Sequence, residues 1–106
     1  MTAFKRLFFV RRLYLHGNNI KTMASSSFTS AAKLQQLTLH DNDIEECPDS
    51  LLAGLDDLKA VNMNNNKLTE LGGQLLENSD NVVEFSVNNN QLESLDGNIF
   101  DGLTFV

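Results

Sequence analysis

The chain has little cysteine, few basic residues and no long apolar run, and each shortage excludes a class of protein. Its 106 residues include a single cysteine, so neither an internal disulfide nor a cysteine-based zinc site can form. Acidic residues outnumber basic ones by 14 to 8, and the resulting net charge of −6 argues against a nucleic-acid-binding protein. No apolar run approaches the roughly 20 residues that a membrane span needs, so we expect none in this chain.

The beginning of the sequence also lacks the marks of a secretory signal peptide. The apolar stretch 7–10 ends at once at Arg11 and Arg12, and no small-residue cleavage site follows. Hydrophobic residues make up 42% and charged residues 21% of the chain, which is the balance of a folded protein. The length allows one domain at most.

Asparagine, in contrast, is abundant, and its clusters indicate a repeat of constant length. Asn66 and Asn90 are 24 positions apart (90 − 66), and the same step backwards, which we call the repeat interval, reaches Asn42 and Asn18. The apolar residues around each asparagine keep this register, with units starting at positions 10, 34, 58 and 82 and no insertion between them. The range 1–106 is therefore predicted to be a single repeat domain of about four units.

Each unit contains a short segment, such as 37–39, in which apolar and polar side chains alternate as they do in a β-strand. One unit alone buries almost nothing. Stacked units would place the strands about 4.8 Å apart in a parallel sheet over a continuous core. The segments after the strands are predicted to be loops, with short helical turns at 50–53 and 74–77. One predicted core row contains Leu13, Leu37, Val61 and Phe85.

The four recurring asparagines follow the predicted strands, where the chain turns into the returning loop. Inside a stack, a backbone group left unpaired in such a turn costs roughly 1–3 kcal/mol. Because an amide side chain both donates and accepts, we expect these asparagines to form an internal ladder that satisfies neighbouring turns. The predicted ladder consists of Asn18, Asn42, Asn66 and Asn90. Four other asparagines lie outside its register and are expected to face solvent, namely Asn64, Asn65, Asn88 and Asn89.

The pattern L-x-x-L-x-L-x-x-N-x-L, followed by x-x-L-x-x-x-x-F-x-x-L, resembles the leucine-rich repeat family over essentially the whole chain. Units of this length with a phenylalanine near the nineteenth place, as at Phe28 and Phe100, are similar to the typical subclass found in Slit-like proteins, Toll-like receptors and insect secreted immune proteins. The resemblance implies an α/β solenoid, right-handed and curved, with a parallel sheet on its concave face and loops and short helical turns on its convex face. It also implies an extracellular location, in a secreted protein or a receptor ectodomain.

Two features depart from the secreted members of that family: a signal peptide is missing, and no asparagine lies in an N-x-Ser/Thr sequon. Both polar caps are missing as well, because Met1 falls within a repeat and Val106 begins a fifth one. Solenoids need polar terminal units. We therefore expect a fragment of a longer repeat protein, with self-association through the uncapped ends. The alternative is a natural four-unit protein that dimerises through an open end.

Function in the resembled family usually lies on the concave face, whose side chains are the strand positions outside the apolar rows. Charge along this predicted face changes from basic, through neutral amides, to weakly acidic. Such a surface suits a protein partner, with hydrogen bonds and Tyr or Arg anchors providing specificity. The candidate partner-binding residues are Arg12, Tyr14, His16, Gln36, Thr38, His40, Asn62, Asn64, Glu84, Ser86 and Asn88.

The sequence contains no recognisable catalytic, cofactor or metal site. Cys47 shares the register of Met23 and is predicted to be an apolar core residue, with no base to activate it. Short stacked units provide no cleft for paired carboxylates, and neither a Gly-rich phosphate loop nor a catalytic triad signature is present. His16 and His40 are expected to be neighbours near Asp41. A metal site or a pH-sensitive contact there is the weaker alternative to plain surface residues.

The sequence therefore predicts a non-enzymatic module that recognises a protein partner. Two alternatives remain open: a structural or adhesive extracellular element, and an intracellular scaffold of the same fold. A signal peptide and cysteine caps in a full-length transcript would favour the recognition module or the extracellular element, and their absence would favour the intracellular scaffold.

Overall fold

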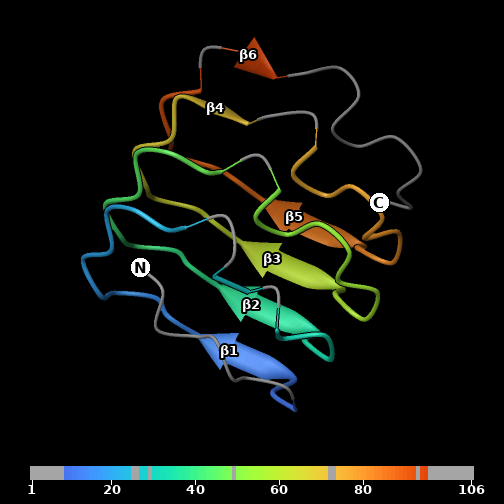
Figure 1. Ribbon diagram of the computed structural model, residues 1–106. Helices are drawn as coiled ribbons and strands as arrows, with labels where there is room; N and C mark the ends of the chain where they lie inside the picture. Colours follow the sequence, from blue (N-terminus) through green and yellow to red (C-terminus); the bar gives the residue numbers. More distant parts are fainter. Residues whose placement is uncertain are drawn as a thin grey trace.

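The computed structural model describes residues 9–24, 27–28, 30–48, 50–71, 74–92 and 94–95, and this part of the chain contains two parallel sheets (Figure 1). The larger sheet has four strands, which lie side by side in chain order: β1 (Arg12–Tyr14), β2 (Gln36–Thr38), β3 (Ala60–Asn62) and β5 (Glu84–Ser86). The smaller sheet pairs β4 (Glu70–Leu71) with β6 (Ser94–Leu95), on segments that follow β3 and β5.

Strands β1, β2 and β3 each pair with the strand that lies one repeat interval further along the chain. Leu37 lies opposite Leu13 on one side and opposite Val61 on the other. The backbone bonds repeat at the same interval: the Leu15 N–H donates to the Thr38 carbonyl at 2.8 Å, and the two later units contain the equivalent bond at the same length. This parallel pairing and register are those that the sequence period predicts.

The core lies between the larger sheet and the returning segments. Leu37 on β2 is fully buried in it, and so are Leu39 and Met63, which directly follow β2 and β3. Full burial of one such side chain contributes about 1.5–3 kcal/mol. From the returning segments, Phe28 is also fully buried, whereas its predicted counterpart Phe100 lies outside the described residues. The remaining fully buried large side chains are Leu34, Ile44, Leu51, Leu52, Leu58, Leu68, Leu75 and Val82.

The returning segments consist of loops, isolated turns and the short strands β4 and β6, and the described residues include no helix. The Ala53 N–H donates to the Ser50 carbonyl at 3.2 Å, and the Glu77 N–H donates to the Gln74 carbonyl at the same distance. Each bond closes one turn that does not continue into a helix, so these segments hold single turns where short helical turns were expected. Within the described ranges no helix is long and apolar enough to cross a bilayer.

Candidate interaction surface

Side chains of the larger sheet alternate between the core and the opposite side, which we call the outer sheet face. The face continues past the strands through the positions where His16 and His40 stand. None of its side chains is buried. The outer sheet face consists of Arg12, Tyr14, His16, Gln36, Thr38, His40, Ala60, Asn62, Asn64, Glu84, Ser86 and Asn88. All the candidate partner-binding residues of the sequence analysis thus lie together on it, and Ala60 is the one addition.

The charges of the outer sheet face lie at its two ends. Arg12 on β1 and Glu84 on β5 are both exposed and are separated by three strand spacings, about 14 Å. Tyr14 is 52% exposed, and its hydroxyl donates a long bond of 3.4 Å to Gln36 Oε1. Among the described residues the one ion pair is Lys67 Nζ to Asp43 Oδ1 at 3.6 Å, away from this face. The two charged ends are therefore free to meet charges of a partner.

The two histidines of the face are stacked. Their ring centroids are 4.6 Å apart and their planes differ by 6°, while the Tyr14 ring lies 6.4 Å from His16. His16 Nδ1 lies 3.1 Å from the Thr38 hydroxyl, whereas His40 Nδ1 is buried with no hydrogen-bond partner in the structure. The lone pair of an imidazole nitrogen lies in the plane of its ring. Because the two ring planes are almost parallel, the lone pairs of His16 and His40 do not point at one metal ion. Within the described residues no three His, Cys, Asp or Glu side chains form a potential metal site.

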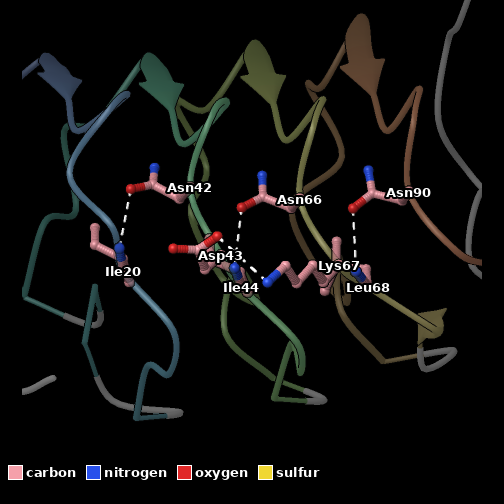
Figure 2. A network of polar contacts seen from close by, with 8 residues as sticks. All are labelled: Ile20, Asn42, Asp43, Ile44, Asn66, Lys67, Leu68 and Asn90. Carbon is pink, nitrogen blue, oxygen red and sulfur yellow. Dashed lines mark hydrogen bonds and ion pairs between the residues drawn. The ribbon is translucent and has the colours of Figure 1, made fainter.

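Three of the recurring asparagines point between consecutive units, as Figure 2 shows. Asn42 Oδ1 accepts the backbone N–H of Asn18 at 2.8 Å and of Ile20 at 3.1 Å. Its amide nitrogen donates to the carbonyls of Leu15 and Leu39, both at 3.0 Å. One side chain thus satisfies backbone groups of its own turn and of the preceding one.

The same pattern recurs in the next unit at Asn66 and in the one after it at Asn90. Asn66 accepts the Ile44 N–H, and Asn90 accepts the Leu68 N–H, both at 3.1 Å. Exposure differs along the row: Asn42 and Asn66 are buried, Asn90 is half-buried and Asn18 is exposed. These four side chains act on the backbone of the protein itself and do not belong to the outer sheet face.

A second row of residues in the same turn adopts the left-handed backbone conformation, which the sequence analysis missed. Gly17, Asp41, Asn65 and Asn89 have φ of 70°, 58°, 58° and 58°, and they follow one another at the repeat interval. Gly, Asp and Asn are the residues that tolerate this conformation best, so their recurrence at one position was an available signal. The turn also links units, because Asn65 Nδ2 donates to Asp41 Oδ1 at 2.8 Å.

The four asparagines expected to face solvent are not equivalent. Asn65, Asn88 and Asn89 are exposed, but Asn64 is only half-buried, and its Oδ1 accepts the Asn88 backbone N–H at 2.6 Å. The amide oxygen of Asn64 is thus already bonded to the backbone of the next unit. Sequence register separated these residues from the ladder but gave no sign of this second set of bonds.

Ser79 is a buried polar residue that the sequence pattern left unexplained. It stands one repeat interval after Leu55 and is fully buried. Its hydroxyl donates to the Leu52 carbonyl at 2.5 Å and accepts the Leu55 N–H at 2.8 Å. Because both partners belong to the preceding unit, Ser79 connects two returning segments as the asparagines connect two turns.

Cys47 is half-buried, whereas Met23 and Leu71 in the same register are buried. It lies beside a hollow of about 380 Å³ between returning segments, which accounts for its accessibility. The hollow is lined by Thr22, Met23, Glu45, Glu46, Cys47, Pro48, Thr69 and Glu70. Its ionisable lining residues other than Cys47 are the three glutamates, and no histidine is among the residues that line it.

The outer sheet face itself contains a smaller hollow, of about 140 Å³, above Ala60. Ala60 lies between Gln36 and Glu84 in the strand register, and Asn62 and Ser86 line the hollow on the next outward row. A methyl side chain stands here between two long ones. No protein-family model matches this chain, and no curated protein matches it significantly.

Proposed function

We propose that this chain is a module of the leucine-rich repeat type that recognises a protein partner through its outer sheet face. The observation that carries the proposal is the accessible polar surface formed by the outward side chains of four paired strands. Amides and hydroxyls fill its middle, an exposed tyrosine lies on β1, and opposite charges mark its ends. Interfaces of this kind gain specificity from hydrogen bonds and from Tyr and Arg anchors.

The family assignment is part of the proposal. It is supported by strand pairing at the repeat interval and by asparagine side chains that bond across consecutive turns. On this assignment the chain is a curved solenoid, and the outer sheet face is its concave side. An extracellular location, in a secreted protein or a receptor ectodomain, is proposed from the sequence resemblance.

A protein partner is favoured over a small molecule by the shape of the face. Small-molecule sites usually enclose about 300–1,000 Å³. The hollows on the outer sheet face measure about 140 and 280 Å³ and are open to solvent. Hollows of this size fit single side chains of a partner that covers the face.

The proposal is tested by selecting binders from a phage library of random peptides against the purified chain. We expect Tyr14→Ala and Thr38→Arg to weaken binding of the selected peptides at least ten-fold, because these residues lie on the outer sheet face. Gln74→Arg, an exposed change on a returning segment, is the matched control and should leave binding unchanged. Nitrogen-15 NMR spectra verify that each variant is folded. Failure to select any binder, or an equal loss in Gln74→Arg, would refute the proposal.

A further inference from the structure

The hollow above Ala60 is a slot one side chain wide. Gln36, Ala60 and Glu84 are direct neighbours across three strands, so the two long side chains stand about 10 Å apart with a methyl group between them. The buried side chains of Leu37 and Val61 lie beneath the slot, and Thr38, Asn62 and Ser86 line it on the next outward row. The slot therefore has buried core residues beneath it and polar side chains around it.

One charged group, the carboxylate of Glu84, lies among uncharged polar side chains around this slot. The carboxylate of Glu84 is exposed and has no ion-pair partner among the residues that the structure describes. Ser86, on the same strand as Glu84, adds a hydroxyl oxygen that can accept a further bond, whereas Gln36 Oε1 already accepts the Tyr14 hydroxyl. A planar guanidinium group has five donors and binds a carboxylate through two parallel bonds. The charge and the paired donors of arginine both match the carboxylate of Glu84.

The slot opens into a second hollow at the start of the strands, of about 280 Å³. The two share Gln36, Ala60 and Glu84, while Arg12 and Lys59 line the second one alone. We consider an extended segment of a partner that places one side chain in the slot. An acidic side chain beside Arg12 and Lys59 would then be about one or two residues away along that segment. The groove thus favours a segment that carries both signs of charge.

We propose that the hollow above Ala60 is a specificity pocket for an arginine side chain of the protein partner, with Glu84 as its counter-charge. This proposal rests on the recognition function proposed above. It adds that the partner must present an arginine side chain. Arginine enters beside Glu84, and an acidic residue of the same segment lies toward Arg12 and Lys59.

The pocket is tested directly with a small probe, N-acetyl-arginine methylamide, titrated into the nitrogen-15-labelled chain at tens of millimolar. We expect saturable shifts of the Ala60 and Glu84 amide resonances. The citrulline derivative has the same shape without the charge, and it should bind at least ten-fold more weakly. Equal binding of the two derivatives, or shifts confined to other residues, would overturn the pocket.

Variants sharpen this test. Ala60→Gln fills the slot with the side chain found at its neighbour Gln36, and should abolish the shifts. Ala60→Ser is the matched control, because it leaves the slot open and should keep them. Glu84→Gln should weaken binding at least five-fold. Retention of full binding by Ala60→Gln would refute the pocket.

The peptides selected from the library separate this proposal from the broader one. If Thr38→Arg abolishes their binding and replacing their arginines with citrulline weakens it at least ten-fold, both proposals stand. If Thr38→Arg abolishes it and the replacement has no effect, recognition by the outer sheet face stands and the arginine pocket is wrong.

Discussion

Equivalent residues of the inner and outer repeat units differ in burial, although they occupy the same place in the pattern. Leu37 of the second unit and Val61 of the third are at most 2% exposed. Leu13 of the first unit and Phe85 of the fourth occupy the same row and are only half-buried. The comparison teaches that a core position of this pattern is completed by contacts from the units on both of its sides.

The asparagines show the same contrast. Asn42 and Asn66 are buried, and each accepts from the preceding turn while donating to it. Asn18 is exposed and donates within its own turn, to the carbonyls of Leu15 and His16. The same side chain thus bonds to the preceding unit in the middle units, whereas in the first unit it donates only within its own turn.

The largest expected difference between inner and outer units concerns the core leucines. Leu37→Ala removes a fully buried side chain and leaves a cavity, so we expect it to lower the free energy of unfolding by about 3–4 kcal/mol. Leu13→Ala, the same change at a half-buried position, should cost about 1–2 kcal/mol. Urea unfolding followed by circular dichroism measures both. Equal losses would show that burial in this row does not depend on neighbouring units.

The next effect concerns the asparagines. Asn66→Ala leaves the Ile44 N–H without its side-chain acceptor, so we expect a loss of about 1–3 kcal/mol. The carbonyls of Leu39 and Met63 each lose one of two amide donors and keep the one from Asn42 or Asn90. Asn18→Ala should cost less than about 1 kcal/mol, because its bonds are exposed to water. The same unfolding experiment measures both. Hydrogen exchange adds a local readout, since the Ile44 amide should lose protection in Asn66→Ala alone.

The sequence was sufficient to predict those features of the fold that repeat at one fixed interval. The repeat interval placed Leu13 opposite Leu37 and Leu37 opposite Val61, because stacked units of equal length leave one register available. It also placed His16 beside His40. Such pairings follow from the period without knowledge of any side-chain conformation.

Features that depend on the shape of one turn were not predictable in the same way. Ser79 replaces an apolar residue of the pattern, and its two bonds to the preceding unit depend on how closely the returning segments approach. The slot above Ala60 arises from a difference in side-chain length across three strands. The sequence contains these residues, but only the register and the geometry of the sheet show what they form together.

The smallest effect concerns the left-handed turns of the returning segments and compares two units directly. Gly54 has φ of 71°, and Asn78, its equivalent in the next unit, has φ of 62°. An added Cβ at Gly54 would meet no atom within 4 Å, so a substitution there changes backbone strain and little else. Gly54→Ala should therefore cost about 1 kcal/mol, or about 4 °C in the melting temperature. Gly54→Asn copies the residue that the next unit uses at this position, and should cost only a few tenths of a kcal/mol because asparagine tolerates positive φ. Thermal unfolding of the two variants side by side decides the point. A melting temperature of Gly54→Ala equal to that of the wild type would show that the turn relaxes to another conformation, and a larger loss in Gly54→Asn than in Gly54→Ala would show that the two units do not use the same turn.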